Sequence, residues 1–337
     1  MRVYELTQSG GIDGLRIVER PTPRPGPGQV LVRVHAASLN FRDLLIAKGR
    51  YRRGTPKDPL VPLSDGAGVI VEVGPGVRSR KAGDRVAGNF FQKWIDGPFD
   101  AGKAESALGG AIDGVLAEYV VFDEGAAVLV PPSLSLEEAA TLPCAAVTAW
   151  VALFELGGLK TRESIVAMGT GGVSIFALQL AKAAGARVIL TSSQDGKLER
   201  GKALGADDTI NYRTVPAWGD RVRELTGGRG VDHILEVGGD RTLPESLRAV
   251  RDGGHICLVG LLGGAPADLV SAQKNPTGIR VDSVFVGSVR HFEAMNDAIE
   301  KGRIRPVVDR VFPFEQSREA YRFLERGDHF GKIVIVC

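Results

Sequence analysis

Short apolar segments separated by glycine and proline make up the first third of the chain. The segment MRVYELTQSGG at residues 1–11 predicts a first strand, and QVLVRVHAAS at 29–38 predicts a second. DGAGVIVEVGPGV at 65–77 and GVLAEYVVFD at 114–123 predict two more, with Gly74-Pro75-Gly76 as a turn. We therefore expect residues 1–124 to form a β-rich, antiparallel, barrel-like domain.

From residue 125 to 288, apolar strands alternate with helical patterns. SIVAM at 164–168 predicts a buried strand, and the following segment, which ends near Gly185, has Ile175, Leu178 and Ala181 at helical spacing. Further strand and helix patterns continue this alternation: RVILTS, KLERGKALGA, DTINY, VDHILEVGG and GHICLVGLLGG. The alternation predicts an α/β fold with a parallel, doubly wound sheet.

The C-terminal segment 289–337 is of mixed character. SREAYRFLERG at 317–327 predicts a helix with Ser317 as its N-cap, and KIVIVC at 332–337 predicts a closing strand. If that strand rejoins the first domain, residues 1–124 and 289–337 form one domain, and residues 125–288 are inserted into it.

The turn GTGGVS at 169–174 predicts a dinucleotide site. It follows a strand and opens a helix, and this context gives the glycine pattern its meaning. Gly169 allows the tight turn, and Gly171 and Gly172 let the backbone approach a pyrophosphate. The helix starting near Val173 directs N–H groups at the phosphates, and Ser174 replaces the usual third glycine. The alternative is a tight turn that binds no nucleotide.

The end of the next strand favours NADP over NAD. An NAD site places an acidic residue there, whereas this strand ends in Ser192 and Ser193, which suit a 2′-phosphate. Lys197 lies one helical turn further on, and Tyr212 could close the adenosine pocket. Asp195 fits better as a first-turn helix residue than as the ribose acid. Taken singly, the serines could cap the helix and Lys197 could be solvated.

Composition and charge exclude several classes of protein. The 337 residues carry 42 basic and 40 acidic side chains, a net charge of +2, without a basic stripe for nucleic acid. No apolar run reaches the roughly 18 residues of a membrane helix, and the N-terminus lacks a signal-peptide core. We expect a cytoplasmic protein without nucleic-acid or membrane partners. The three cysteines form no CxxC pair and no disulfide framework.

An ordered series of motifs along the whole chain resembles the medium-chain dehydrogenase/reductase superfamily. The motifs are GPGQVLVRVHAASLNFRD, GAGVIVEVGPGV, AGDRV, AATLPCAAVTAW, GTGGVS, KLERGKALGAD and the terminal GKIVI. The resemblance implies a GroES-like catalytic domain with an inserted Rossmann domain and an active site in the cleft between them. It also implies a dimer or tetramer, and we expect a homodimer acting on a small carbonyl or quinone substrate.

The chain departs from the zinc members of that superfamily at their metal ligands. Asn40 stands where they carry a cysteine, and SDGAG at 64–68 replaces their Gly-His-Glu stretch. Cys144 matches a third ligand, but one cysteine does not hold a tetrahedral ion, so we interpret it as a small apolar residue. No cysteine lies between Phe90 and Glu118, where the structural zinc lobe would be. The chain resembles the zinc-independent, quinone oxidoreductase-like branch, and we predict no metal.

The same resemblance implies catalytic roles for three residues. Tyr51 matches a tyrosine that donates a proton or clamps a carbonyl in enoyl reductase-like relatives; alternatively it packs in a loop or gates it. Asn40 can donate an amide N–H to the substrate or the nicotinamide ribose, or it can be a structural amide. Asp43 orients its neighbours by accepting backbone N–H groups, or takes a direct part in proton transfer.

Further residues are expected around the nicotinamide. Alternatively, the apolar residues are ordinary strand ends, and Lys332 is a surface lysine on the terminal strand. The residues are Thr148, Val259, Leu261, Phe285, Val286, Phe330 and Lys332.

These observations lead to one functional hypothesis and two alternatives. The hypothesis is an NADPH-dependent, zinc-independent oxidoreductase that reduces quinones or conjugated enones by hydride transfer. Without a metal to polarise a simple carbonyl, the acceptor's own conjugation must help it take the hydride. The alternatives are a metal-free NADP-dependent alcohol dehydrogenase or carbonyl reductase, and a non-catalytic NADPH-binding protein. The sequence does not identify the acceptor.

Overall fold

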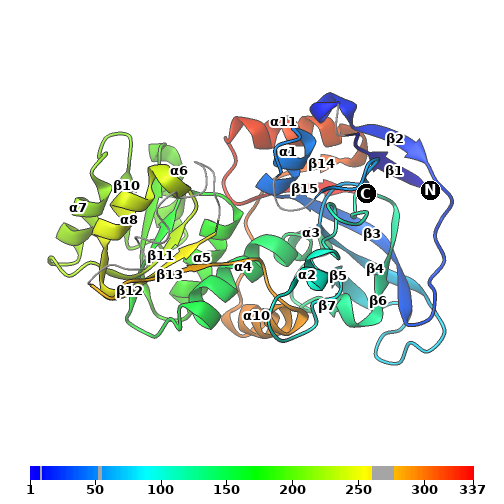
Figure 1. Cartoon of the computed structure of the whole chain (residues 1–337), viewed down its shortest axis with the longest axis horizontal. Coiled ribbons are helices and arrows are strands. Elements are labelled where there is room, and N and C mark those ends of the chain that lie inside the picture. The colour runs from blue at the N-terminus through cyan, green and yellow to red at the C-terminus, as the bar shows by residue number, and fades with distance from the viewer. Residues whose placement is uncertain (8–9, 52–54, 260–276) are drawn as a thin grey trace. The chain divides into compact units, whose positions relative to one another are not determined.

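The computed structural model describes residues 1–7, 10–51, 55–259 and 277–337. It divides into two compact units, the first formed by Met1–Val147 with Val286–Cys337 and the second by Thr148–Phe285 (Figure 1). The first unit thus includes residues 125–147 and 286–288, which the sequence analysis placed in the inserted domain. Within the described ranges, no helix combines the length and the apolar character needed to cross a membrane.

A seven-stranded sheet forms the centre of the first unit, in the order β14–β15–β3–β4–β5–β7, with β6 paired to β3. Its pairs are antiparallel except for β14 with β15, which are parallel. A separate hairpin pairs β1 (Arg2–Glu5) with β2 (Arg16–Glu19). The seven strands are β3 (Gln29–Leu39), β4 (Asp65–Val73), β5 (Arg85–Gly88), β6 (Tyr119–Asp123), β7 (Ala127–Leu129), β14 (Val308–Pro313) and β15 (Lys332–Val336).

The closing strand rejoins the N-terminal part of the chain, as predicted. In β15, Ile333 pairs with Leu39 and Val336 with Ala36. The strand predicted at 114–123 is regular only from Tyr119. The helical segments of this unit are η1 (Gly11–Gly14), α1 (Phe41–Ala47), α2 (Ala101–Ala104), η2 (Glu124–Ala126), α3 (Leu136–Ala139), η3 (Leu142–Ala146), α10 (Val289–Gly302), η6 (Phe314–Gln316) and α11 (Ser317–Arg326).

The prediction that Ser317 caps the last helix was wrong by one position. Gln316 precedes α11, and Ser317 is its first helical residue. The Ser317 hydroxyl donates to the carbonyl oxygen of Phe314 at 2.7 Å, so it closes the turn that leads into the helix. That helix carries Tyr321 and Leu324 into the apolar core of the first unit, where they pack with residues such as Leu15, Leu63 and Phe122.

The second unit is built on a six-stranded parallel sheet, which confirms the predicted fold. Its order is β10–β9–β8–β11–β12–β13, the strand order 3-2-1-4-5-6 of a Rossmann fold. Every residue of β8 and β11 is buried, as expected for central strands covered on both faces. The strands are β8 (Ser164–Met168), β9 (Arg187–Ser192), β10 (Asp208–Asn211), β11 (Val231–Glu236), β12 (Val250–Leu258) and β13 (Arg280–Ser283).

The helical segments of the second unit follow its strands. Gly185, with φ of +78°, follows the end of the first of the long helices, as predicted. The helical segments are α4 (Val147–Trp150), which begins at the last residue of the first unit, η4 (Val151–Leu156), α5 (Gly172–Ala183), α6 (Asp195–Ala203), α7 (Trp218–Leu225), η5 (Gly239–Arg241) and α8 (Leu243–Ala249).

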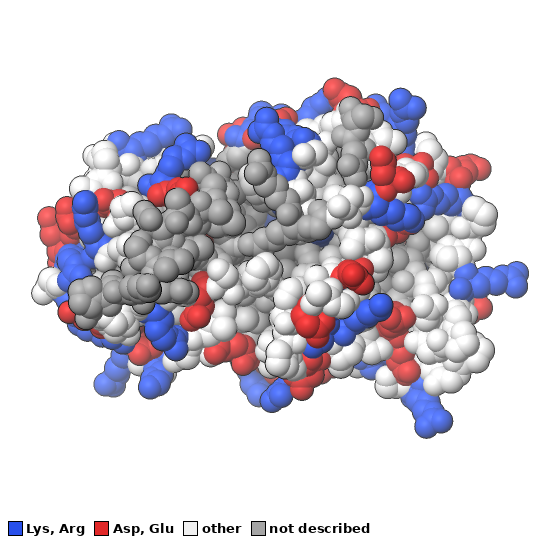
Figure 2. Space-filling model, in the orientation of Figure 1, with Lys and Arg blue, Asp and Glu red and all other residues white. Residues whose placement is uncertain are grey.

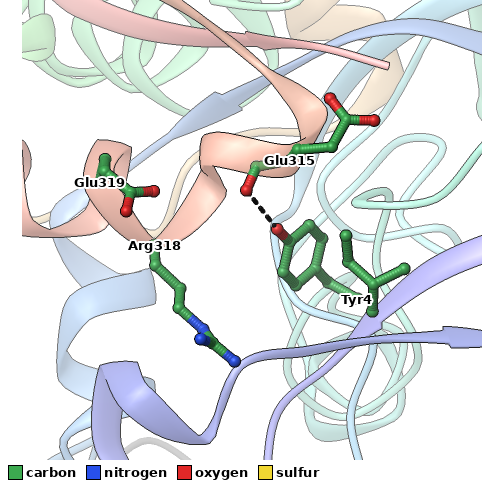
Figure 3. Close-up of a pocket in the computed structure, with 5 residues that line it drawn as sticks. Tyr4, Glu315, Arg318 and Glu319 are labelled. Carbon is green, nitrogen blue, oxygen red and sulfur yellow. Dashed lines mark hydrogen bonds between the residues drawn. The ribbon is translucent and has the colours of Figure 1, made fainter.

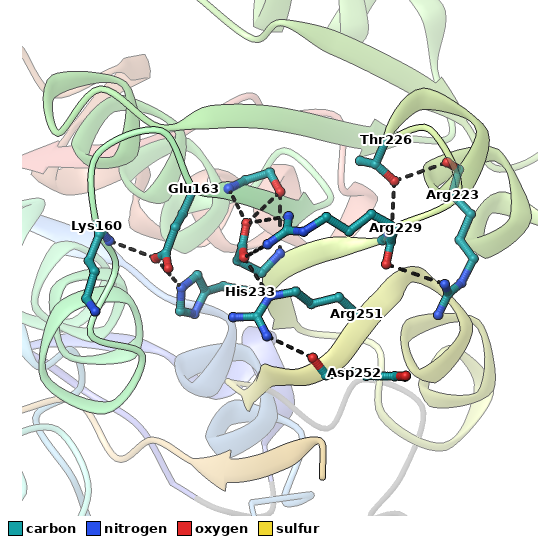
Figure 4. Close-up of polar contacts among 11 residues, drawn as sticks. Lys160, Glu163, Arg223, Thr226, Arg229, His233, Arg251 and Asp252 are labelled. Atoms are coloured by element: carbon teal, nitrogen blue, oxygen red, sulfur yellow. Dashed lines mark hydrogen bonds and ion pairs between the residues drawn. The ribbon is translucent and has the colours of Figure 1, made fainter. Parts of the chain in front are cut away.

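A buried carboxylate joins the amino ends of three strands of this sheet, and two of its partners, Arg229 and Arg251, are labelled in Figure 4. Asp232 on β11 accepts hydrogen bonds from Arg229, from Arg251 on β12 and from the backbone N–H and hydroxyl of Ser164 on β8. Burial alone would raise the pKa of Asp232, but these donors outweigh it and hold the pKa well below its usual range. Asp232 therefore stabilises the amino ends of the central strands, whereas the GTGGVS turn lies at their carboxyl ends.

Candidate functional site

The GTGGVS turn leaves the carboxyl end of β8 and enters α5. Gly169 has φ of +75°, a left-handed conformation that favours glycine. Gly171 precedes α5 with an ordinary φ of −78°, so backbone strain does not explain a glycine there. A Cβ at Gly171 would meet no atom within 4 Å. The space above Gly171 is therefore open, as a pyrophosphate cradle requires.

Ser174 has a definite structural partner. Its side chain is buried, and its hydroxyl donates to the carbonyl oxygen of Met168 at 2.5 Å. The hydroxyl thus joins the first turn of α5 to the last residue of β8. The third glycine of the usual fingerprint permits this close packing of helix and strand. In this chain serine allows the same packing and adds a hydrogen bond to it.

The predicted adenosine residues gather where β9 and β10 end. Ser192 is the last residue of β9, and its carbonyl oxygen accepts from the backbone N–H of Tyr212 at 3.1 Å. Ser193 follows directly, and Lys197 lies in the first turns of α6. Asp195 is a first-turn residue of α6, as predicted, and accepts from Asn211 Nδ2 at 2.7 Å.

Lys332 lies at the centre of a polar cluster buried within the first unit. It is the first residue of β15, and its side chain is 3 % exposed. Its Nζ donates to Oδ1 of Asn40 at 2.5 Å and to the carbonyl oxygen of Leu39 at 2.6 Å. Oδ2 of Asp65 lies 3.8 Å from the same nitrogen. We call Asn40, Asp65 and Lys332 the ammonium cluster.

Asp65 is held by donors on both of its oxygens. Oδ1 accepts from the Ser64 hydroxyl at 2.7 Å, and Oδ2 accepts from the backbone N–H of Cys144 at 3.2 Å. Burial raises the pKa of Asp65, while the charge of Lys332 and the Asn40 side chain favour its ionised form. Burial also raises the pKa of the Cys144 thiol, which keeps it protonated and unreactive.

Asp43 lies one helical turn from Asn40, in the first turn of α1. Its Oδ2 accepts from the backbone N–H of Asn40 at 2.8 Å. Burial, with 1 % of the residue exposed, raises its pKa to about 7, although Arg42 and Lys332 oppose the shift. Asp43 therefore fixes the backbone at Asn40, as predicted.

Tyr51 stands beside a cationic side chain that the sequence analysis did not single out. The guanidinium carbon of Arg42 lies 5.3 Å from the Tyr51 ring centroid and 4.5 Å from that of Phe90. Arg42 Nη1 donates to the carbonyl oxygen of Leu108 at 2.7 Å. The Tyr51 ring itself packs against the apolar core of the first unit. This arrangement holds the ring through a cation–π contact.

The residues of this site do not fit a catalytic zinc ion. Among the residues that the structure describes, no group of three or more His, Cys, Asp or Glu side chains could hold a metal. The three positions that match zinc ligands carry an amide, Asp65 and a protonated thiol, and the Lys332 ammonium lies among them. An ammonium ion and a divalent cation repel each other, so the cluster disfavours a metal.

An aromatic cluster occupies the segment where zinc relatives have their cysteine lobe. The Phe91 ring packs in tilted or edge-to-face contacts against Phe90, Trp94 and Phe99, with ring centroids 4.6, 5.9 and 4.8 Å apart. The side chain of Asn89 donates to the carbonyl oxygen of Phe91 at 2.8 Å. Apolar burial and ring contacts thus order a segment that the sequence analysis characterised only by its lack of cysteines.

The remaining predicted nicotinamide residues lie in both units. Thr148 and Phe330 are buried, while Val259 and Phe285 are partly exposed. Val286 has φ of +56°, a strained conformation for a β-branched residue. Leu261 lies outside the described residues. The roles of these side chains stay predictions.

A hollow of about 270 Å³ lies elsewhere on the first unit (Figure 3). It is lined by Tyr4, Ile17, Glu315, Arg318 and Glu319. The Tyr4 hydroxyl donates to the carbonyl oxygen of Glu315 at 3.1 Å, and Arg318 Nε donates to that of Leu15 at 2.7 Å. None of the predicted site residues lines this hollow.

Comparison with known proteins identifies the class to which this fold and site belong. Residues 26–132 match the alcohol dehydrogenase GroES-like domain, and residues 172–301 match the zinc-binding dehydrogenase domain. With its glycine turn and Rossmann sheet, the chain belongs to the medium-chain dehydrogenase/reductase superfamily. It is an oxidoreductase of that superfamily with a fold that binds a nicotinamide dinucleotide.

Relatives match the chain over nearly its whole length. A zinc-type alcohol dehydrogenase-like protein of Schizosaccharomyces pombe, C1773.06c, is 45 % identical and covers 99 % of both chains. The 2-methylene-furan-3-one reductase of Solanum lycopersicum is 32 % identical, covering 99 % of this chain and 79 % of its own.

Two solved structures share the fold over 100 % of both chains. An NAD-dependent alcohol dehydrogenase is 35 % identical, with a TM-score of 0.88. The mycobacterial protein Rv1454c, complexed with NADPH, is 28 % identical, with a TM-score of 0.82.

Proposed function

We propose that this protein is an NADPH-dependent, zinc-independent oxidoreductase that reduces quinones or conjugated enones. The observation that carries the proposal is the Lys332 ammonium, 2.5 Å from Asn40 Oδ1 and 3.8 Å from Asp65 Oδ2. A metal that would polarise a simple carbonyl does not fit beside it. This site therefore suits an acceptor whose conjugation spreads the incoming charge onto an oxygen that a hydrogen-bond donor can hold.

The cofactor would be held by the carboxyl edge of the Rossmann sheet. The open space at Gly171 and the N-terminus of α5 suit its pyrophosphate, and Ser192, Ser193 and Lys197 suit a 2′-phosphate. Tyr212 would close the adenosine pocket. The NADPH complex of the relative Rv1454c supports this choice, whereas the NAD-dependent neighbour represents the alternative.

Bound NADPH supplies the hydride, and the chain supplies donors and orientation. Asn40 would donate an amide N–H to the acceptor oxygen or the nicotinamide ribose, because its Nδ2 makes no hydrogen bond with the described residues. Tyr51 would donate a proton to the reduced acceptor or clamp its carbonyl. Asp43 would keep Asn40 in place through its backbone. Thr148, Val259, Leu261, Phe285, Val286 and Phe330 would surround the nicotinamide.

A second candidate function, an alcohol dehydrogenase or carbonyl reductase, is supported by the name of one relative, while the name of another supports the reduction of a conjugated enone. The S. pombe protein is called alcohol dehydrogenase-like, which favours reduction of a simple ketone or oxidation of an alcohol. The tomato protein is named for reduction of a 2-methylene-furan-3-one, in which a C=C bond is conjugated to the ketone. Among the described residues no set of side chains fits a metal, which favours the conjugated enone over the simple ketone as the substrate.

The test is NADPH oxidation by the purified protein, in the presence of a chelator, with an ortho-quinone, a conjugated enone and the matching saturated ketone. We expect turnover of the quinone or the enone but not of the ketone. Equal turnover of the ketone would favour the carbonyl reductase. Saturable NADPH binding without oxidation by any acceptor would favour a non-catalytic protein.

We also propose a cytoplasmic homodimer that pairs through the strand β13. Within the described residues β13 pairs with β12 on one side only, and an edge strand must be paired or protected. Acidic and basic side chains are mixed over the face shown in Figure 2, which gives no support for a nucleic-acid partner. Sedimentation at several concentrations tests the dimer.

A further inference from the structure

We infer that Lys332 is a positioning residue: its ammonium group fixes the carboxamide of Asn40 so that the amide N–H₂ is available to the acceptor or the cofactor. The inference rests on the proposed function, since it assigns a task within that site. It differs from the expectation that Lys332 itself meets the cofactor. All of the contacts that carry it lie within the first unit.

The chemistry of the two side chains decides which end of the amide faces Lys332. An ammonium group has three donors and no acceptor, so it can face only the carboxamide oxygen. The 2.5 Å contact between Nζ and Asn40 Oδ1 therefore leaves Nδ2 as the other end of the group. That nitrogen is buried and makes no hydrogen bond of normal length with the described residues, although the Asn40 side chain lies close enough to Asp65 to favour its ionised form. A buried donor without a partner is costly unless a ligand satisfies it.

The backbone around Asn40 is fixed by independent contacts. The N–H of Asn40 donates to Asp43, and the carbonyl oxygen of the preceding Leu39 accepts from Lys332. Lys332 thus contacts both the residue before the amide and the amide itself. Rotation of the Asn40 side chain would break the contact with Nζ. The backbone N–H of Asp43 also faces the Asn40 side chain in the capping box of α1, and Lys332 is the charged group that favours this orientation of the carboxamide.

Asp65 explains why a lysine can remain charged at this buried position. A buried ion is stable only when it is paired and hydrogen-bonded. Asp65 is 0 % exposed, lies 3.8 Å from Nζ, and is held by Ser64 and by the Cys144 backbone. The Asp65 carboxylate thus balances the charge of the Lys332 ammonium group. Removal of Lys332 alone would strand the carboxylate, so a clean test removes both charges.

The test compares wild-type protein with D65N/K332M, N40A and the combined N40A/D65N/K332M variant. K81M is the matched control, because the Lys81 side chain is 83 % exposed and pairs with Asp84 at the surface. We expect D65N/K332M and N40A each to lower kcat for the enone by roughly 100-fold, the usual effect of losing one oxyanion donor. NADPH affinity should change by the same factor in these two variants, because both lose the same positioned amide.

The combined variant shows whether Lys332 acts through Asn40. We expect it to be no slower than N40A, since residues that act as one unit are not additive. If D65N/K332M kept full kcat, or if its effect multiplied with that of N40A, the inference would be overturned.

A second readout does not need turnover. Selective ¹⁵N-asparagine labelling resolves the side-chain amide signals, and N40A assigns those of Asn40. We expect these signals to move in D65N/K332M and not in K81M; unchanged signals would overturn the inference. If the wild type failed to oxidise NADPH with any of the acceptors, the proposed function would be contradicted instead, while the amide signals would still decide the role of Lys332.

Discussion

The backbone N–H of Asn40 donates to the carboxylate of Asp43 at 2.8 Å, across the first turn of α1. This contact joins a buried acid to the residue whose side chain faces Lys332. The acid is itself surrounded by charge, because Arg42 and Lys332 favour its ionised form and Asp65 opposes it. The protonation of Asp43 is therefore linked both to folding and to the geometry of Asn40.

We predict that Asp43 makes the fold less stable as pH rises through neutrality. Its pKa is about 7 in the folded protein, against 3.8 for an exposed aspartate, so the folded chain binds more protons between these values. The free energy of unfolding should fall across this window by on the order of 1 kcal/mol per pH unit on account of Asp43, and level off above it.

D43N tests this, because an amide keeps the acceptor for Asn40 and cannot ionise. Urea unfolding from pH 4 to pH 8 should show a weaker pH dependence in D43N than in wild type. Parallel curves for the two proteins would contradict the assignment.

The two glycines of the cofactor turn should respond differently to alanine. At Gly171 the backbone is ordinary and a Cβ meets nothing, so G171A should fold normally and weaken NADPH binding by about tenfold or more. At Gly169 the φ of +75° makes alanine cost about 1 kcal/mol of stability. Thermal unfolding and NADPH titration separate the two effects. Unchanged NADPH affinity in G171A would argue against a pyrophosphate there.

An added acid after β9 should weaken the preference for NADPH over NADH. In S193D, a carboxylate would oppose the 2′-phosphate, and like charges in contact cost several kcal/mol. We expect kcat/KM for NADPH relative to NADH to fall by about tenfold or more. D195N is the control, because Asp195 is paired with Asn211 and should not affect the ratio. A wild type that prefers NADH would overturn the assignment of NADP.

The carboxylate of Asp232 should stabilise the second unit measurably. D232N removes the charge that Arg229 and Arg251 share, and we expect a loss of about 2 kcal/mol in the free energy of unfolding. R221A, which breaks an exposed pair with Glu224, should cost less than about 0.5 kcal/mol.

The pH dependence of Asp232 has the opposite sign to that of Asp43. The folded pKa lies below the unfolded one, so the contribution is present above about pH 4 and is lost on further acidification. Urea unfolding at pH 7 and at pH 3 checks both statements. An unchanged midpoint for D232N at pH 7 would contradict them.

Local patterns could predict the second unit because a parallel sheet repeats a short unit. Each strand there is a buried apolar run followed by a turn and a helix, so β8, β9 and the GTGGVS turn follow from residues close together in the chain. The prediction failed at Ser317, where the preceding 3-10 turn, Phe314–Gln316, moves the cap to Gln316.

The ammonium cluster could not be predicted in the same way. Lys332 and Asn40 are 292 residues apart, and only the pairing of β15 with β3 brings them together. In the sequence, Asn40 and Asp65 stand at positions where zinc relatives have metal ligands. No local pattern indicates that the ammonium group of a lysine lies beside them. Arg42 was missed for a similar reason, because its partner Phe90 lies on a distant segment.

The most direct test of the central claim is where the hydride goes. NADPH carrying deuterium at the transferable position, a conjugated enone, a chelator and the wild-type protein are incubated together, and the product is analysed by NMR. We expect a saturated ketone with one deuterium on the carbon β to the carbonyl. Deuterium on the carbonyl carbon, in an allylic alcohol, would contradict it.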